Sequence, residues 1–354
     1  MRGRQKKQLS MLVVSNLDDR VPPDHPLRAI KALADAVLKD LNPSLTRMYA
    51  KTGRTSIPPE RLLKGMLLLA LYSIRSERQL CEQLQYNLLY RWFLDMDLTE
   101  TVFDPSSFSH NRKRLMQHRA PQKFFALVVG RAASDGLMSS EHFSVDGTLI
   151  DAWASIKSFR PKDDDDDNDS NGWADFKGQS RKNDTHESKT DPEAKLMRKG
   201  RGKEAKLSYS AHALMENRNG LLLDFRVAEA NGRAERDVAE QMMKTHLHRG
   251  NTLGADANYN TRAFVAACRE QGVKPHVAGK TRSSAVDART TRHETYAASQ
   301  KVRKRIEQIF GWLKTVAGLR KSRFRGRART EAYAVMAGAA YNLLRVAKLS
   351  GATA

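Results

Sequence analysis

Three acidic residues, far apart along the chain, lie in settings that suit a divalent metal ion. Asp146 ends the run Phe-Ser-Val-Asp and Asp256 ends Leu-Gly-Ala-Asp, which is how a buried strand delivers a carboxylate to the end of a sheet. Glu307 is the one acidic residue among eleven Lys or Arg between residues 301 and 329. Because basic side chains hold a polyanion while carboxylates hold a metal, this combination predicts metal-dependent chemistry on a phosphodiester.

Phosphodiester cleavage of this kind uses two divalent ions about 4 Å apart, which activate the nucleophile and stabilise the leaving oxygen. Carboxylate ligands suit Mg²⁺, and Mn²⁺ can substitute for it. We expect Asp146 to bridge both ions, with Asp256 on one of them and Glu307 on the other. The histidines show no spacing typical of zinc ligands, and His212 is expected to be a packed residue within a strand.

The charge balance indicates the partner. The 354-residue chain has 61 Lys and Arg against 40 Asp and Glu, a net charge of +21. This excess predicts a polyanionic partner, with double-stranded DNA ahead of an anionic membrane and no small-molecule substrate. The alternative is a basic surface that is only solvated, but the clustering of the charges argues against this interpretation.

Compartment and membrane association follow from two further features. Cys81 and Cys268 are the only cysteines, so no disulfide framework is available and a reducing compartment is expected. The longest apolar run, residues 66–72, is too short to span a bilayer. We therefore expect a cytoplasmic protein, associated with the nucleoid, that has no membrane segment.

The length favours two domains, and the first third has the signals of an all-helical one over residues 1–138. Pro58-Pro59-Glu60 predicts a helix start, and Ser76 with Gln79 forms a candidate capping box. Asp104-Pro105 is a second start signal, and residues 121–136 have helical spacing. We interpret this part as a DNA-binding domain.

The period of the pattern changes after Gly136. Strands are expected at residues 141–150, 207–216, 221–230, 251–256 and 274–278, with Asn219-Gly220 as a hairpin turn. Helices are expected at residues 234–246, 261–271, 299–317 and 330–347. This order predicts a fold of the α/β class, a ribonuclease-H-like mixed sheet catalytic domain over residues 139–349. In that fold the first strand, the fourth strand and a later helix converge, and these are the elements that carry Asp146, Asp256 and Glu307.

The catalytic domain is interrupted by a charged insertion at residues 157–205. It has few apolar residues, so we expect it to be mobile. The aspartate run at residues 163–167 is expected to be solvated rather than to bind metal.

The expected helix at 299–317 carries three charged residues on one face. Arg303, Glu307 and Lys314 are separated by four and seven positions. An alternative is open, in which Glu307 only forms an ion pair with Arg303 on an amphipathic basic helix.

Two further sets of residues are candidates for DNA contacts. Asn111, Arg112 and Arg114 follow the Asp104-Pro105 start and could place polar groups in a groove; the alternative is a helix that packs on the catalytic domain. The second set comprises Arg320, Lys321, Arg323 and Arg325, followed in the sequence by Arg327 and Arg329. We expect its contacts to position the phosphate backbone without reading the base sequence.

The spacing Arg303-x₃-Glu307-x₆-Lys314 resembles the R-E-K part of the Y-R-E-K signature of bacterial DDE transposases of the insertion sequence five family. Val-Asp-Gly-Thr at Asp146, Gly-Ala-Asp-Ala-Asn-Tyr at Asp256 and Leu-Leu-Tyr-Arg-Trp-Phe in the first third are similar to that family too. The resemblance covers nearly the whole chain outside the insertion. It departs from the family at Gln300, where the signature has tyrosine, and at Asn260, where aspartate is common.

The resemblance implies a function. It implies that Asp146, Asp256 and Glu307 form a metal-binding triad and that Arg303 and Lys314 contact phosphates. It also implies binding to transposon terminal inverted repeats, hydrolysis at the DNA ends and transfer of the 3′-OH strand to target DNA by a homodimer. Two alternative functions remain open: a catalytically retired transposase acting as a DNA-binding repressor, and a general nuclease of the same fold.

Overall fold

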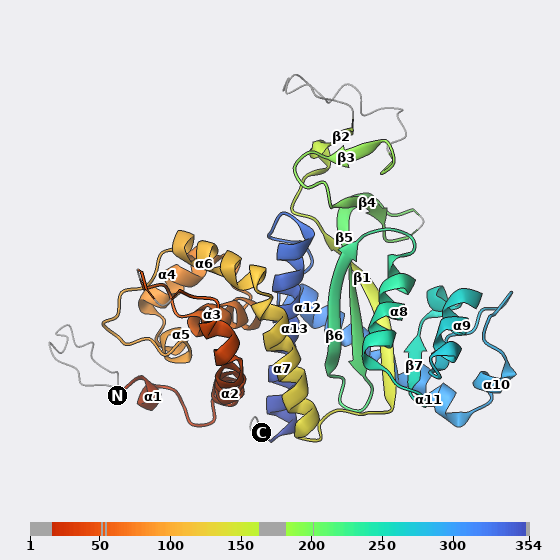
Figure 1. The fold of residues 1–354 in the computed structure, drawn as a ribbon, viewed down its shortest axis with the longest axis horizontal. Helices are drawn as coiled ribbons and strands as arrows, with labels where there is room; N and C mark the ends of the chain where they lie inside the picture. Colours follow the sequence, from red (N-terminus) through yellow and green to blue (C-terminus); the bar gives the residue numbers. More distant parts are fainter. Residues whose placement is uncertain (1–15, 51, 54, 163–181, 201, 352–354) are drawn as a thin grey trace, which may run out of the picture.

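The computed structural model describes residues 16–50, 52–53, 55–162, 182–200 and 202–351. A helical region comes first, and a sheet flanked by helices follows it (Figure 1). This arrangement confirms the predicted fold class: a helical N-terminal part and a ribonuclease-H-like mixed sheet. None of the helices in the described ranges is long and apolar enough to cross a membrane.

The helical region begins with α1 and ends with α7, and side-chain caps fix several of its helix starts. Ser76 accepts a hydrogen bond from Gln79 N, and Asp104 accepts from the backbone N–H groups of Ser106 and Ser107, as their positions in the sequence predict. His25 caps the long helix α2 through its ring nitrogen, a start that was not predicted. The helices are α1 Leu17–Arg20, α2 Pro26–Thr46, α3 Pro59–Leu71, α4 Glu77–Tyr86, α5 Leu88–Phe93, α6 Pro105–Gln117 and α7 Ala120–Ser134.

The main sheet has the strand order of a ribonuclease-H-like fold. The long strand β5 pairs with β1 along one edge and with β4 and β6 along the other, all antiparallel. Beyond β1 come β7 and β8, both parallel. The strands are β1 His142–Asp151, β4 Lys195–Arg198, β5 Ala205–Glu216, β6 Leu222–Glu229, β7 Thr252–Ala255 and β8 Lys274–Val277.

Helices cover both faces of this sheet. On one face α8 and α9 pack over an apolar cluster that includes Val145, Met242, Leu253 and Phe264. On the other face lie α12 and α13, whose buried side chains join those of the helical region in one continuous core. Figure 1 shows α13 between the helical region and the sheet. The remaining helices are α8 Ala234–His246, α9 Arg262–Glu270, α10 Ala288–Thr291, α11 Glu294–Val302, α12 Arg305–Thr315 and α13 Arg327–Leu349, with the 3₁₀ turns η1 Ile156–Ser158 and η3 Ala257–Tyr259.

The charged insertion carries regular structure at both ends, which its polar composition does not predict. Strands β2 (Phe159–Pro161) and β3 (His186–Ser188) form a small sheet that projects beyond β4 (Figure 1). Asp191 is buried and accepts a hydrogen bond of 2.7 Å from the Tyr209 hydroxyl. Glu193 accepts from Arg327 N at the start of α13. These contacts anchor the second half of the insertion to β5 and to the start of α13. The aspartate run at 163–167 lies outside the described residues.

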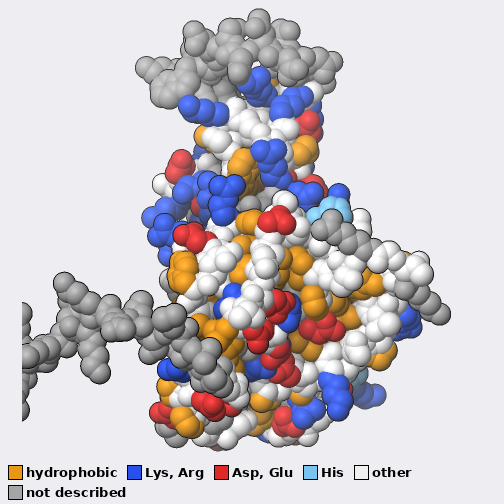
Figure 2. All heavy atoms as spheres, turned by 90° about the vertical axis from the view of Figure 1, so that its left-hand side faces the viewer, with side chains coloured by type: hydrophobic (Ala, Val, Ile, Leu, Met, Phe, Trp, Pro, Cys, Tyr) orange, Lys and Arg blue, Asp and Glu red, His pale blue; other side chains and the backbone are white. Residues whose placement is uncertain are grey.

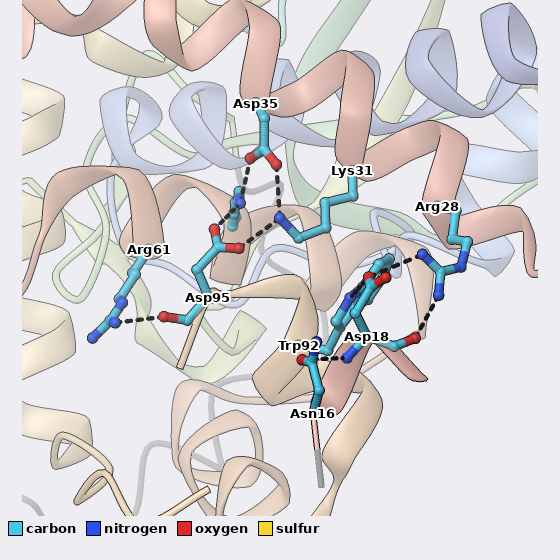
Figure 3. Close-up of polar contacts among 9 residues, drawn as sticks. Asn16, Asp18, Arg28, Lys31, Asp35, Arg61, Trp92 and Asp95 are labelled. Carbon is cyan, nitrogen blue, oxygen red and sulfur yellow. Dashed lines mark hydrogen bonds and ion pairs between the residues drawn. The ribbon is translucent and has the colours of Figure 1, made fainter. Parts of the chain in front are cut away.

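A network of charged side chains holds the helical region together (Figure 3). Lys64 of α3 is only 2% exposed, and its ammonium group contacts the carboxylates of Asp35 on α2 and Asp95 after α5. Lys31 reaches the same two carboxylates at 2.7 and 2.6 Å. Nearby, the Trp92 indole N–H donates to Asp18 at 2.8 Å. Because a buried ammonium group is stable only when it is paired, these aspartates fix how α2, α3 and α5 pack.

We expect Lys64→Met to lower the free energy of unfolding by about 1–3 kcal/mol, because it leaves the two carboxylates facing each other with Lys31 alone. The loss stays below that of a fully buried ion pair, since Asp35 and Asp95 are 40% and 59% exposed. Urea unfolding measures it. Lys39→Met, on the exposed side of α2, is the matched control, and equal stability of the two variants would contradict the interpretation.

Candidate catalytic site

The site lies where β1 and β7 part. These strands pair in parallel from His142–Thr252 to Ser144–Gly254, and the pairing stops there. Asp146 and Asp256 each follow the last pair by two residues, so the shared register brings them to the same level of the sheet. A fork at the carboxyl ends of parallel strands is where open α/β sheets bind their ligands. The predicted convergence of these two acids is thus a consequence of strand register.

Burial and neighbouring charges act on Asp146. The pKa of its carboxyl group is raised to about 7, chiefly by burial and to a smaller extent by the carboxylates of Asp256 and Glu235. The Gly147 N–H, which donates to Asp146 at 2.8 Å, and the guanidinium of Arg303 oppose this shift. The carboxylates therefore lie close enough to repel one another, as they do where a cation is to be held between them.

Glu235, in the first turn of α8, packs against β1 on the α8 side of the sheet, opposite the face toward which Asp146 points. Its Cγ and Oε1 atoms lie 2.8 and 2.9 Å from where a Cβ atom on Gly147 would be. Burial raises the pKa of Glu235, and Asp256 adds to the shift. In the sequence, Gly147 could have indicated this approach, since a glycine inside a strand often marks a close approach by another group.

A buried tyrosine faces the same acids. Tyr259, in the turn η3 directly after Asp256, is 0% exposed, and its hydroxyl has no hydrogen-bond partner among the described residues. Burial raises its pKa well above the ordinary value, and Glu235, Asp146 and Asp256 raise it further. A hydroxyl buried without a partner is costly, so this one points to a group that the cluster would bind.

Glu307 is placed differently from the two aspartates. It is exposed in the first turn of α12, and its carboxylate makes no hydrogen bond or ion pair within the described ranges. The alternative in which it pairs with Arg303 is therefore not what the structure shows. Among the described residues no three His, Cys, Asp or Glu side chains are grouped closely enough to hold a metal ion. Asp146 and Asp256 follow the end of the β1–β7 ladder and interact electrostatically, with Glu307 on the adjacent helix.

The expected single helix at 299–317 is two helices. Helix α11 ends at Val302 and α12 begins at Arg305. Between them the backbone stays helical but tightens, because Ile306 and Glu307 donate to the carbonyls three residues back, at 3.1 Å each. The break coincides with Arg303, which donates to the Gln300 side chain at 2.9 Å. Gln300 in turn donates to the His276 carbonyl on β8.

Lys314 lies further along the same face of the sheet. Its ammonium group donates to Thr148 Oγ1 at 2.5 Å, two residues beyond Asp146 on β1. Burial lowers its pKa, and the positive charges of Lys199 and Arg320 lower it further. Arg303 and Lys314 therefore place positive charge on either side of the position of Glu307.

Other residues singled out in the sequence have structural partners. His212 is fully buried on β5, where burial lowers its pKa to about 4 and keeps the ring neutral; it is a packed residue, as predicted. Asn260 donates to the Ala278 carbonyl and accepts from Ala285 N at 2.7 Å. An aspartate at position 260 could not donate, so asparagine suits this link between two loops.

Of the predicted DNA-contacting residues of α6, Arg112 is buried, whereas Asn111 and Arg114 are half-buried. Arg112 is 8% exposed, forms an ion pair with Glu77 and stacks on Phe324 at 4.6 Å. Asn111 donates to the Ser107 carbonyl, and Arg114 stacks on the ring of Tyr49. The exposed side of α6 instead carries Ser106, His110, Lys113 and Gln117, which the spacing of four, three and four residues places on one face.

The basic segment after α12 runs beside the end of β1. Asp151 N donates to the Arg320 carbonyl and Ser322 N donates to the Asp151 carbonyl, about 16 Å along the strand from Asp146. Arg320, Lys321 and Arg325 are exposed. Arg323 is not, because it donates to the Ile74 carbonyl at 2.5 Å and stacks on Tyr333, which joins this segment to the helical region.

A cavity of about 670 Å³ lies between α6 and this segment. Its wall includes Trp153, 43% exposed, with the Arg325 guanidinium 4.3 Å above its ring. Figure 2, which views the molecule from the side of the helical region, shows many Lys and Arg side chains in its upper part and acidic side chains gathered below them. The cavity is lined by residues of both regions, Ser106, Ser109, His110, Arg112, Lys113, Met116, Trp153, Arg323, Phe324, Arg325 and Arg329.

A ribonuclease-H-like sheet with aspartates at the fork, behind a helical region, defines a class of enzymes that cut and join nucleic acid strands. The sequence agrees with this class. Residues 15–114 match the family model described as Transposase domain (DUF772), and residues 175–343 match the one described as Transposase DDE domain. The chain belongs to the DDE transposases. The second model covers Asp256 and Glu307, whereas β1 with Asp146 precedes it.

Solved structures offer only a distant likeness. The chain is similar to a piggyBac transposase synaptic complex with hairpin DNA at 8% identity and a TM-score of 0.42, covering 92% of this chain and 76% of that one. It is similar to a Mos1 transposase paired-end complex with the left transposon end at 10% identity and a TM-score of 0.20, covering 76% and 82%. Neither likeness is close enough to carry an argument about this chain. No curated protein matches it significantly.

The burial of Asp146, with a smaller contribution from the nearby carboxylates, predicts a pH-dependent effect of Asp146→Asn on stability in EDTA. The folded pKa of Asp146 is about 7 against an ordinary 3.8, so ionisation destabilises the fold increasingly as pH rises from 4 to 7. The variant lacks this penalty. We expect it to be more stable than the wild type by about 2 kcal/mol at pH 8 and by much less at pH 5.

Urea unfolding at the two pH values tests this. Asp151→Asn, which also removes a carboxylate from β1, is the control and should show no such growth in the difference. If the gain in the free energy of unfolding from Asp146→Asn is the same at both pH values, the folded state does not disfavour the ionised form of Asp146.

Proposed function

We propose that the fork between β1 and β7 is the catalytic centre at which this DDE transposase hydrolyses DNA ends and then transfers the 3′-OH strand to target DNA. One observation carries the proposal. Asp146 and Asp256, 110 positions apart in the sequence, each follow the last pair of the β1–β7 ladder by two residues and interact electrostatically.

The residues present fit two Mg²⁺ ions, for which Mn²⁺ would substitute. Asp146 and Asp256 supply the oxygen ligands that these ions prefer, and a cation would relieve the repulsion between them. Glu307 completes the proposed triad: its exposed carboxylate is engaged by no other side chain of the described chain. When bound, the ions would activate the attacking oxygen and stabilise the leaving one.

Two cationic side chains support the role of a phosphate site. Arg303 lies close enough to Asp146 to lower its pKa, and Lys314 is held on Thr148 of the same strand. We propose that both contact phosphates beside the scissile bond and so fix the backbone relative to the carboxylates.

The spacing of Arg303, Glu307 and Lys314 supports assignment to the insertion sequence five family with the Y-R-E-K signature. The tyrosine of that signature is Gln300 here. Gln300 accepts from Arg303 and donates to β8, so it orients the arginine without an aromatic ring. We propose that activity survives this replacement because no metal-binding acid is changed.

The DNA would lie across the cavity between the helical region and the basic segment. Arg320, Lys321 and Arg325 are exposed for phosphate contacts. On α6 we propose that His110 and Lys113 face the DNA together with the half-buried Asn111 and Arg114, while Arg112 holds the helix in place and Arg323 holds the segment. The helical region would recognise the terminal inverted repeats, and association with chromosomal DNA would follow.

A transposition event joins two ends, and one catalytic centre handles one end at a time. We therefore propose that two copies of the chain assemble on DNA as a homodimer.

The catalytic proposal is tested on DNA that carries the sequences flanking the gene. We expect nicking at the ends in Mg²⁺ or Mn²⁺, with Asp146→Asn and Glu307→Gln each reduced by at least about a hundredfold because a metal ligand is lost. Asp151→Asn should retain activity. Tight binding without nicking by the wild type would support a repressor, and cleavage that ignores the end sequence would support a general nuclease.

The DNA path is tested by binding at several salt concentrations. We expect Lys113→Gln and Arg325→Gln each to weaken binding to an end about three- to tenfold and to reduce the salt slope by about 1, because each loses one phosphate contact. Lys39→Gln on α2 is the control with an equal change of charge. If both variants keep the wild-type slope, the DNA does not cross this cavity.

A further inference from the structure

A second cavity lies at the β8 edge of the sheet, away from the helical region. Its volume is about 530 Å³, and its wall is formed by the end of α9, the start of β8, α10 and the start of α11. Figure 1 shows α10 and α11 on that side of the sheet. Three of the wall residues are cationic, Arg269, Lys274 and Arg289, and none of the described residues that line the cavity is acidic. The cavity therefore suits an anion.

A carboxylate beside the cavity offsets part of this positive charge. Asp287, directly before α10, accepts hydrogen bonds from Arg269 at 3.2 Å and from Arg289 at 2.7 Å. It fixes both guanidinium groups and leaves further N–H donors on each of them. The ammonium group of Lys274 makes no hydrogen bond or ion pair in the described parts of the chain. Positive charge is therefore in excess around the cavity, and its donors are held in place.

His276 is a buried polar side chain on the wall of the same cavity. It is 2% exposed, and its Nδ1 atom has no hydrogen-bond partner among the described residues. Successive residues of a strand point to opposite faces. Val277 joins the apolar cluster under α8 and α9, so His276 points to the other face, where its ring meets Tyr296 of α11 edge-on. Because a buried nitrogen without a partner is costly, the histidine indicates a ligand independently of the charges.

The ring of His276 is neutral and can donate a hydrogen bond. Its pKa is lowered to about 4, chiefly by burial and to a smaller extent by His142, Lys274 and His293. A neutral imidazole carries one hydrogen on a ring nitrogen, so His276 supplies a donor at the base of a cavity whose other donors are cationic. Phosphate fits this set, because its oxygens accept from guanidinium, ammonium and imidazole groups together.

The exposure of the cations favours an extended polyanion over a free ion. Lys274 is exposed, and the Arg289 side chain is 75% exposed, so both can follow a backbone outside the cavity while one phosphate group enters it. The cavity is also separate from the DNA path proposed above. The α6 cavity adjoins the residues that follow β1, whereas this one adjoins β8, two strands across the sheet.

We propose that this cavity binds a phosphate group of a DNA backbone, with His276 as the buried hydrogen-bond donor and Arg269, Lys274 and Arg289 as the cations around it. The choice of DNA as the partner rests on the function proposed above, whereas the phosphate chemistry does not. The site gives the chain a second place to hold DNA, across the sheet from α6. Because it contacts the backbone alone, it reads no base sequence.

The test is the binding of the full chain to a short duplex without the end sequence, measured by fluorescence anisotropy at several salt concentrations. We expect Lys274→Gln to weaken binding about three- to tenfold and to reduce the salt slope by about 1, because one phosphate contact is lost. His276→Phe removes the ring nitrogens without a change of charge and should weaken binding by a similar factor. Lys39→Gln on α2, the control with the same change of charge as Lys274→Gln, should keep the wild-type affinity.

Thermal unfolding without DNA separates loss of the site from damage to the fold. The His276 ring is buried without a hydrogen-bond partner for Nδ1, so an apolar ring of similar shape should keep or raise the Tm. A Tm lowered by His276→Phe together with weaker DNA binding would give the histidine a structural role and overturn its part in the proposal.

Calorimetry with inorganic phosphate alone distinguishes the two sources of the ligand. Tight binding of inorganic phosphate that is lost in Lys274→Gln, while this variant keeps the wild-type affinity for DNA, would identify a site for a free anion and overturn the assignment to DNA.

The proposed function and this site fail separately. Wild-type DNA affinity and salt slope in both Lys274→Gln and His276→Phe overturn the site, and nicking of transposon ends by the wild type then leaves the proposed function standing. Weaker DNA binding by both variants, without nicking of ends by the wild type in Mg²⁺ or Mn²⁺, supports the site and overturns the proposed function.

Discussion

The parallel pairing of β1 with β7 is the constraint on which the site depends. The ladder lasts for three residues and ends at Ser144–Gly254, so both strands deliver an aspartate two positions past their last contact. A shift of one residue would turn one carboxylate to the other face of the sheet. Gly254 lets the ladder and α11 approach closely, since Ser144 Oγ and Ser299 Oγ each lie 3.0 Å from where its Cβ atom would be. The register thus sets both the geometry of the acids and their mutual repulsion.

Contacts between the helical region and the sheet fix the surroundings of this fork. Helix α13 packs against α7, α3 and β6, which joins the helical region and the sheet in one core. The Ser73 hydroxyl donates to the Val316 carbonyl at 2.7 Å, and Arg323 reaches the Ile74 carbonyl. These contacts fix α6 and the basic segment on either side of one cavity. A DNA molecule bound there would be held by both regions at once, because neither can turn freely about the other.

Local signals predicted much of this fold. The caps Ser76 and Asp104, the Asn219-Gly220 turn and the alternation of strands and helices all act over a few residues, and each lies where the sequence places it. Long-range pairing was harder to predict. Arg112 is a residue type that reads DNA grooves, but here it is buried against Glu77 and against Phe324, and the second contact joins segments more than 200 positions apart.

The central claim is that Asp146 and Asp256 share a divalent cation at the fork. Anomalous diffraction from crystals grown with Mn²⁺ addresses it most directly, because the scattering locates the ion without reference to activity or stability. The account predicts a Mn²⁺ peak between the two carboxylates, within about 2–2.5 Å of an oxygen of each. Mn²⁺ bound at other positions only, with both aspartates free of it, would contradict the account.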